Sequence, residues 1–448
     1  MRPVATLVTA LGLLWAGPAA ADRALPFTPA IDRLDNGLTV VTVKTSTPGI
    51  VAYYTVVRTG SRDEVEKGRS GYAHFFEHMM FRGTEATSPE QYNAVVQALG
   101  ADGNAYTTDD YTAYYLVTPK RGLEAVIGLE ADRFQHLKYA EEAFRTEAGA
   151  VLGEYNNSAS DPREKMWEAG AALAFKAHTY GHTVIGYKAD IEAMPDGFAY
   201  ARDFFRRHYT PDNSTVLVIG DVDHAEVMRL VRAAYGAWTG KADAVEVPVE
   251  PPQTARRAQH IDWPSPSPPL VSVGWRVPGL SAATVDSAAI DVLLELAVGE
   301  TSPLYKRLVL DEQRVEKLTH GADWKRRDPW ILSVDAVLRD ATERDAIVAA
   351  IQGELDRAAR GEIDADRLAA IRSNLRYARL MALDTPGDVG GYLAEIIGLS
   401  GDVEDAERML EGYAQVTAAD VARVAKAHFA APQQIEISLT GTSAEGAK

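Results

Sequence analysis

A succession of strand-like and helix-like segments occurs twice along the chain, and this repetition limits the possible folds more than any other feature. Gly220 ends a buried-type strand 12 residues after His208, and Gly441 ends a similar strand 13 residues after His428. Each strand closes a series in which strands alternate with helices. A repeat on this scale indicates two copies of one lobe. The length of 448 residues agrees, because one hydrophobic core rarely serves so many residues.

A proline-rich stretch separates the two copies. Val247 to Pro269, VPVEPPQTARRAQHIDWPSPSPP, concentrates proline, serine and charge, which favour an extended linker. We therefore expect an α+β protein of two homologous lobes, each an antiparallel-rich sheet packed with helices. The expected segments are a signal peptide over 1–21, an N-terminal lobe over 29–245, a linker over 246–269 and a C-terminal lobe over 270–445.

Local patterns predict the individual elements. Ser88-Pro89-Glu90-Gln91 combines an N-cap, a first-turn proline and a capping-box glutamine, which predict a helix that ends near Gly100. The turn residues Asp35-Asn36-Gly37 predict a hairpin within 31–45. Further strands are expected at 50–58, 104–119, 215–220, 270–277, 331–338 and 435–441. Further helices are expected around residues 74–78 and at 122–136, 141–156, 224–238, 284–298 and 343–360.

The first 21 residues have the three zones of a secretory signal. Arg2 gives a positive start, Val4 to Trp15 is apolar, and Ala19-Ala20-Ala21 is a small-residue cleavage site. A membrane anchor is the alternative, but the apolar run is too short to span a bilayer comfortably. No later segment has the length of a membrane span. We therefore expect an exported protein, cleaved after Ala21 and without a stable membrane span.

Composition narrows the partners and the chemistry. The formal net charge of −17 argues against nucleic acid or an anionic membrane as the main partner. The chain has no cysteine, which excludes disulfides and thiolate metal sites, so any metal must be held by His, Asp or Glu. Export without disulfides favours a bacterial periplasm.

The segment Gly71 to Met80, GYAHFFEHMM, carries the clearest chemical signal. On a helix, His74 and His78 project from one face, so that two imidazoles can reach one tetrahedral ion. Glu77 lies on the adjoining stripe, where it can take a proton from water at such an ion. The alternative is an amphipathic helix with two ordinary polar histidines. The apolar residues around them favour a buried helix whose histidines need partners, and a metal supplies these.

A third ligand must come from another segment. Glu147 and Glu154 lie seven residues apart, two turns along one helical face. One carboxylate can bind the metal while the other orients a histidine. Spacing alone does not say which does which, and a solvated face of paired acids is the simpler alternative. The small apolar residues between them favour close packing.

The run from Gly71 to Thr84, with Gly60-Ser61-Arg62 before it, resembles the pitrilysin/insulinase family of zinc peptidases, whose inverted motif is HxxEH. It is most similar to bacterial members of about half length, which resemble subunits of mitochondrial processing peptidase. The resemblance covers nearly the whole mature chain and implies the duplicated α/β roll of those subunits.

The resemblance also implies residue roles. A ligand glutamate in the family follows the second histidine by about 76 residues, and Glu154 follows His78 by 76. His74, His78 and Glu154 are then the ligands of one Zn²⁺, Glu147 is the supporting acid and Glu77 is the general base. The family's active-site edge strand is similar to the segment with Asn104-Ala105, where a peptide substrate would add as an extra strand.

The chain departs from the family in its second half. Family members complete the active site with an Arg and a Tyr from a C-terminal-type lobe, in a phrase that resembles SRLY and a later GLAY-like element. Here the two phrases are Ser302-Pro303-Leu304-Tyr305 and Arg314-Val315-Glu316-Lys317, so Pro303 stands where the Arg is expected and the Tyr is missing. Tyr305 and Arg307 lie nearby but are more readily interpreted as ordinary helix residues. The resemblance therefore implies a homologous second subunit that supplies the Arg/Tyr pair.

These observations predict a zinc-dependent endopeptidase that hydrolyses peptides or unfolded polypeptides, as the metal-bearing subunit of a two-subunit enzyme. Two alternatives stay open. One is a non-catalytic binding or assembly subunit that keeps the fold, against which Glu77 argues, because a scaffold needs no base. The other is a self-sufficient homodimeric peptidase that uses Tyr305 or Arg307.

Overall fold

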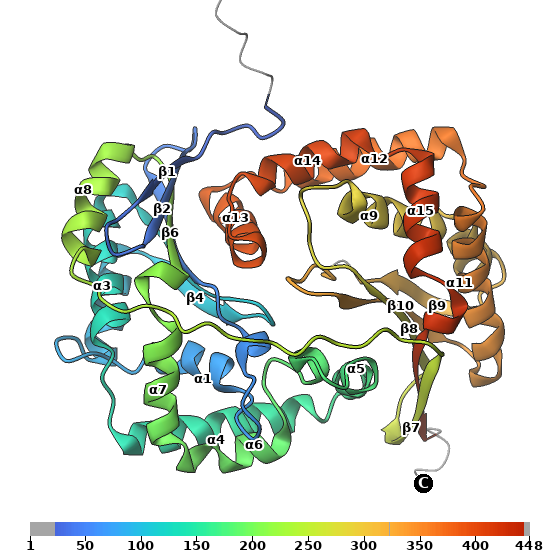
Figure 1. Cartoon of the computed structure of the whole chain (residues 1–448), viewed down its shortest axis with the longest axis horizontal. Coiled ribbons are helices and arrows are strands. Elements are labelled where there is room, and N and C mark those ends of the chain that lie inside the picture. The colour runs from blue at the N-terminus through green and yellow to red at the C-terminus, as the bar shows by residue number, and fades with distance from the viewer. Residues whose placement is uncertain (1–22, 322, 443–448) are drawn as a thin grey trace, which may run out of the picture.

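Two β-sheets, each carrying its own helices, make up the protein in the computed structural model, which describes residues 23–321 and 323–442 (Figure 1). The predicted signal peptide over 1–21 lies outside the described residues. The first sheet contains β1 (Ala30–Arg33), β2 (Thr39–Lys44), β3 (Ile50–Val57), β4 (Asp102–Thr107), β5 (Thr112–Pro119) and β6 (Ser214–Gly220). The second contains β7 (Arg257–Pro266), β8 (Leu270–Val277), β9 (Val315–His320), β10 (Trp330–Leu338) and β11 (Ile435–Thr442).

The two sheets share one topology. The strand order is β1-β2-β6-β3-β5-β4 in the first and β7-β11-β8-β10-β9 in the second. Without β1, both orders place the first strand beside the last, followed by the second, fourth and third. The parallel pairs are β2 with β6 and β7 with β11, and all other neighbouring strands run antiparallel. The predicted α+β class with two homologous, antiparallel-rich lobes is therefore confirmed.

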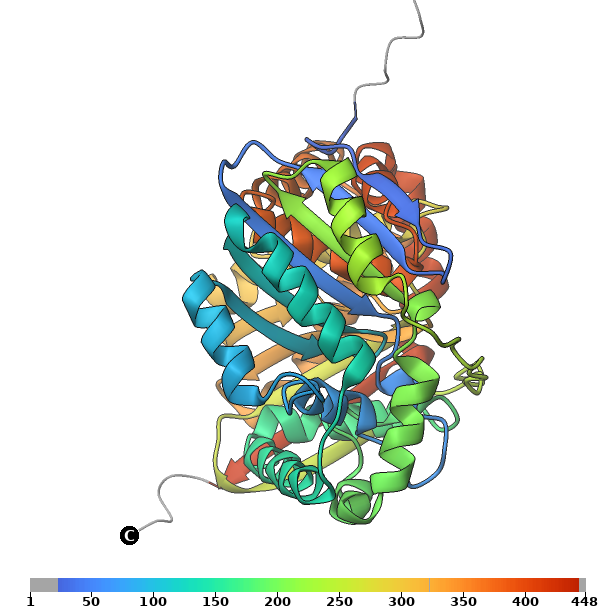
Figure 2. The ribbon, with the colours of Figure 1, turned by 90° about the vertical axis from the view of Figure 1, so that its left-hand side faces the viewer.

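The helices of the first lobe are α1 (Tyr72–Met79), α2 (Pro89–Leu99), α3 (Leu123–His136), α4 (Glu141–Ser158), α5 (Pro162–Ala174), α6 (Lys188–Ala193), α7 (Phe198–His208) and α8 (His224–Tyr235). Those of the second are α9 (Asp286–Ala297), α10 (Pro303–Tyr305), α11 (Arg344–Ala359), α12 (Ala365–Met381), α13 (Pro386–Ser400), α14 (Asp405–Gln415) and α15 (Ala418–His428). Figure 2 shows α3 and α8 across the outer face of the first sheet, and both contact its strands.

The predicted capping of α2 is confirmed. The Ser88 side chain accepts a hydrogen bond from the Gln91 backbone N–H, and the Gln91 side-chain oxygen accepts one from the Ser88 backbone N–H. Gly100 ends the helix in the left-handed conformation, which glycine adopts without a steric penalty. The predicted hairpin around Asp35-Asn36-Gly37 also forms, between β1 and β2.

The single strand expected over 104–119 is wrong. This segment forms β4 and β5, which pair antiparallel through a turn. The Thr108 hydroxyl accepts hydrogen bonds from the backbone N–H groups of Asp110 and Tyr111, and the Thr108 N–H donates to the Tyr111 carbonyl. These bonds close the turn at residues whose side chains favour such local hydrogen bonding.

The linker expected over 246–269 is wrong for its second part. Residues 257–266 form β7, the counterpart of β2, which pairs parallel with β11. Strand β7 lies at the edge of its sheet, and Pro264 and Pro266 lie at its end, where its register with β11 shifts. Compositional bias toward proline therefore hid an edge strand.

The two lobes exchange helices. Helix α13 of the second lobe packs against β3 and β6 of the first sheet, and α5 of the first lobe packs against β7 and β11 of the second. Figure 1 shows both helices between the two sheets. No helix in the described ranges is both long and apolar enough to cross a membrane.

Candidate metal centre

Helix α1 carries His74, Glu77 and His78, and the packing of its other faces fixes its position. Tyr72, Ala73, Phe75, Phe76 and Met79 are buried. The Phe75 ring meets Phe144 of α4 edge-on at 5.0 Å. The helix is only eight residues long, so its stability comes mainly from this packing.

A buried carboxylate caps the start of α1. Glu64 accepts hydrogen bonds from the backbone N–H groups of Gly71, at 2.7 Å, and Ala73, at 2.6 Å. Gly71 has a φ of +90°, and a Cβ there would lie 2.5 Å from the Ile185 carbonyl oxygen, so no other residue fits without displacement. Burial raises the pKa of Glu64 well above its usual value, and the two backbone bonds favour its charged form. Glu64 was not among the residues predicted for the site.

Helix α4 brings the third candidate ligand to the two histidines. A Glu154 carboxylate oxygen lies 3.7 Å from His74 Nε2 and 3.6 Å from His78 Nε2. One donor atom from each of the three residues falls within 4.8 Å of the others. Both histidines are largely shielded, whereas 47% of the Glu154 side chain is exposed, so one side of the group is open.

Glu147 holds the second histidine in place from behind. Its carboxylate lies 2.8 Å from His78 Nδ1 and also pairs with Arg82. Burial of Glu147 opposes its charge, but the bonds from His78 and Arg82 lower its pKa overall. A carboxylate on Nδ1 fixes the imidazole tautomer, so that Nε2 keeps its lone pair and faces Glu154. The structure thus separates two glutamates that spacing alone left equivalent.

His74 is poised as a neutral ligand. Burial, with a smaller effect from His78, lowers the pKa of His74 to about 4. Its Nδ1 is buried and, within the described part of the chain, has no hydrogen-bond partner. Metal ligation requires a neutral imidazole, which this environment provides at neutral pH.

Glu77 lies beside the edge of the first sheet. The Thr107 hydroxyl at the end of β4 donates a hydrogen bond of 2.7 Å to its carboxylate. Burial raises the pKa of Glu77, and the bond from Thr107 partly offsets this. A shielded carboxylate with a raised pKa is suited to accept and release a proton.

Asn104 and Ala105 lie on β4, the outermost strand of the first sheet. They pair with Tyr115 and Tyr114 of β5 on one side, which leaves the other edge of β4 without a partner strand among the described residues. The same strand therefore carries the predicted substrate edge and the hydroxyl that contacts Glu77.

The structure does not bring Tyr305 and Arg307 into this group. Tyr305 ends the short helix α10 and packs against the hydrophobic core of the second lobe. Arg307 lies in the following π-helical turn, Lys306–Asp311, with an exposed side chain. Neither forms a hydrogen bond or ion pair with the candidate metal ligands within the described residues.

The geometry of the three donors fits a zinc ion. Ligand atoms 2.0–2.2 Å from a tetrahedral ion lie about 3.4 Å from each other. The observed oxygen–nitrogen separations of 3.6 and 3.7 Å are close to this value. Two imidazole nitrogens and one carboxylate, open on one side, make up the donor set of catalytic zinc sites.

Comparisons with known proteins agree with the fold and the site. A family model described as Insulinase (Peptidase family M16) matches residues 39–188, and one described as Peptidase M16 inactive domain matches residues 199–375. The zinc protease PqqE of Helicobacter pylori is 26% identical over 421 residues, which is 91% of each chain. The beta subunit of the mitochondrial-processing peptidase of Blastocladiella emersonii is 28% identical over 218 residues, 48% of this chain and 46% of that protein.

The fold itself has close counterparts among solved structures. The crystal structure of a protease from Helicobacter pylori superposes with a TM-score of 0.85 at 25% identity. The match covers 92% of this chain and 100% of the other.

Proposed function

Because this chain belongs to the pitrilysin/insulinase family of peptidases, family M16, we propose that it is a zinc-dependent endopeptidase acting on peptides or unfolded polypeptides. The convergence of His74, His78 and Glu154, with Glu77 beside them, carries this proposal. A bound zinc would supply Lewis-acid chemistry, polarising the scissile carbonyl and lowering the pKa of water.

Glu77 performs the proton transfers in this proposal. Its carboxylate accepts the proton of the attacking water and then donates it to the leaving amine. The raised pKa of Glu77 supports both steps. It makes the carboxylate a stronger base toward water, and it brings the pKa nearer to neutral pH, where the same group can also act as the acid.

Strand β4 binds the substrate in this proposal. An extended peptide adds to the free edge and forms backbone hydrogen bonds along Asn104 and Ala105. The scissile bond then lies near Thr107 and Glu77, which are joined by a hydrogen bond.

A homologous second subunit completes the site in this proposal, by supplying the Arg/Tyr pair that stabilises the developing oxyanion. Pro303 in place of the expected Arg supports this, as does the packing of Tyr305 against the core of the second lobe. The purified chain alone should then hydrolyse peptides slowly. A fully active homodimer would instead favour Tyr305 or Arg307. The sequence of residues 1–21 supports export to a periplasm.

The direct test uses Glu77→Gln, which preserves size and removes the base. We expect this variant to retain the zinc content of the wild type, measured by metal analysis. Its hydrolysis of a quenched unstructured peptide should fall by about 100-fold or more. His78→Ala is the control, because it should lose both zinc and activity. Equal turnover by Glu77→Gln and wild type would refute the base assignment. A zinc-loaded wild type without peptidase activity, alone or with its partner, would indicate a non-catalytic assembly subunit.

A further inference from the structure

A cavity of about 620 Å³ lies between α5 and the inner face of the second sheet. Its walls come from α5 on one side and from β8, β9, β10 and β11 on the other. It is distinct from the metal centre, because none of the residues assigned to zinc binding or proton transfer lines it. The proposed peptidase function therefore does not use it.

The cavity exists because the second lobe differs from the first at equivalent positions. The ladders align the two sheets: Thr215 of β6 faces Val56 of β3, and its counterpart Ile435 of β11 faces Gly274 of β8. In the first sheet the cross-strand pair Tyr54 and Tyr115 stacks at 5.2 Å and fills the space under α13. The equivalent pair in the second sheet is Ser272 and Asp335. Two large aromatic side chains are thus replaced by a hydroxyl and a carboxylate.

The next pair along the strands also becomes smaller and more polar. Val56 faces Ala113 in the first sheet, whereas Gly274 faces Ser333 in the second. The carboxylate of Asp335 stands where the first sheet has the ring of Tyr115. Burying a charged group without a charged partner costs free energy, so its presence points to a ligand rather than to stability.

Asp335 points into the cavity and lacks a cation. Its carboxylate accepts a hydrogen bond of 3.0 Å from the Ser333 hydroxyl. Within the described ranges it forms no ion pair. Burial raises the pKa of Asp335, while the Ser272 and Ser333 hydroxyls favour its charged form. His320 also lowers the pKa of Asp335, but this histidine is itself paired with Glu295.

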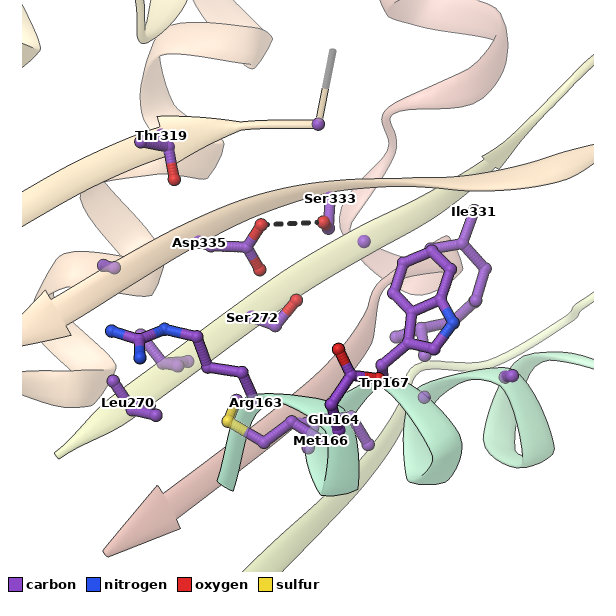
Figure 3. A pocket seen from close by; sticks show the side chains of 18 of the residues that line it. Arg163, Glu164, Met166, Trp167, Leu270, Ser272, Thr319, Ile331, Ser333 and Asp335 are labelled. Carbon is purple, nitrogen blue, oxygen red and sulfur yellow. Dashed lines mark hydrogen bonds between the residues drawn. The ribbon is translucent and has the colours of Figure 1, made fainter. Parts of the chain in front are cut away.

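The side chains around Asp335 change in character from one end of the cavity to the other, as Figure 3 shows from close by. At one end Trp167 of α5 reaches toward Ile331, and the Trp167 side chain is 42% exposed. Ser272 and Asp335 occupy the middle. At the other end Arg163, an exposed residue of α5, extends beside Leu270. Along the cavity, the aromatic side chain of Trp167 is thus followed by the carboxylate of Asp335 and then by the guanidinium of Arg163.

We propose that this cavity is a second ligand site, which binds a small molecule with a primary ammonium group on an aromatic body. The ammonium group donates hydrogen bonds to Asp335, and the aromatic group packs against Trp167 and Ile331. Two sources share this chemistry, a free arylalkylamine and an aromatic amino acid. The amino acid also carries a carboxylate, which would lie toward Arg163 and distinguish the two.

The test is calorimetric titration of the full-length zinc-loaded protein with phenethylamine, phenylalanine and uncharged 2-phenylethanol. We expect at least one of the first two to bind with a Kd of about 1 mM or tighter. We expect 2-phenylethanol to bind at least about tenfold more weakly, because it lacks the charge-assisted hydrogen bond. Tighter binding of phenylalanine, lost in Arg163→Gln, identifies an amino acid ligand. Tighter binding of phenethylamine identifies a free amine.

Variants locate the site. Asp335→Asn should weaken binding by about tenfold or more, whereas Asp323→Asn, an exposed acid at the same cavity, should not. Ser333→Leu should block binding by filling the space, whether or not Asp335→Asn folds well. His78→Ala should bind as the wild type does. The proposal is overturned if neither charged compound binds at millimolar concentration. It is equally overturned if Asp335→Asn and Ser333→Leu bind normally, or if His78→Ala loses binding.

Discussion

At the residue scale, the hydrogen bond from Thr107 to Glu77 sets how strongly the candidate base holds its proton. Burial raises the pKa of Glu77, and the bond to the charged carboxylate lowers it. Thr107→Val has nearly the same shape but cannot donate this bond. The pKa of Glu77 should then rise further, so Glu77 stays protonated to higher pH. The acid limb of the kcat/KM–pH profile should move upward by about one unit.

The control for this prediction is Thr107→Ser, which keeps a hydroxyl and should keep the wild-type profile. An unchanged acid limb in Thr107→Val would show that the limb does not report Glu77.

The sequence could not reveal this pair, since residues 77 and 107 are brought together only by the packing of α1 against β4. Helical spacing did predict that His74 and His78 share a face, because that relation is local. Their role in binding zinc stays a prediction.

At the scale of elements, the β4–β5 hairpin is held by a buried ion pair from the other lobe. Asp109 in its turn accepts a bond of 2.6 Å from Arg326 Nε, and both side chains are at least 90% shielded. Asp109→Asn removes the buried carboxylate that accepts the hydrogen bond from Arg326 Nε. We expect a loss of about 3 kcal/mol in the free energy of unfolding, measured by denaturant titration. The KM for peptide should also rise, because β4 loses its anchor.

Asp102→Asn is the matched control, since Asp102 lies at the exposed start of the same strand. Comparable losses in both variants would exclude the anchoring role of Asp109.

The sequence predicted strand character throughout 104–119 because β-forming residues lie on both sides of the turn. The turn depends on the local hydrogen bonds of Thr108 and on Asp109, whose partner Arg326 is distant in sequence. The edge strand β7 was missed for the opposite reason, because its composition is that of a linker.

At the scale of the whole molecule, the duplicated order of strands predicted two lobes but not their exchange of helices. A helix pattern shows which face is apolar, not which sheet covers it. Helix α13 is apolar on most sides, since it packs against its own lobe and against β3 and β6. Close approach requires Gly390, whose Cβ position lies 2.2 Å from the ring of Tyr54. Tyr54 cannot easily move, because its hydroxyl bonds to the Gly387 carbonyl and its ring stacks on Tyr115.

Two adjacent glycines allow this contact between the lobes to be tested. Both lie inside α13, where alanine favours helix by about 1 kcal/mol over glycine. A Cβ at Gly391 would meet only the Tyr54 hydroxyl, at 3.9 Å, so Gly391→Ala should keep or raise the melting temperature. Gly390→Ala must push α13 off the first sheet, and should lower the free energy of unfolding by about 1–3 kcal/mol. Calorimetry should still show one transition for the wild type, because each lobe covers a sheet face of the other. Equal stability of the two variants would mean that the lobes are not packed through Gly390.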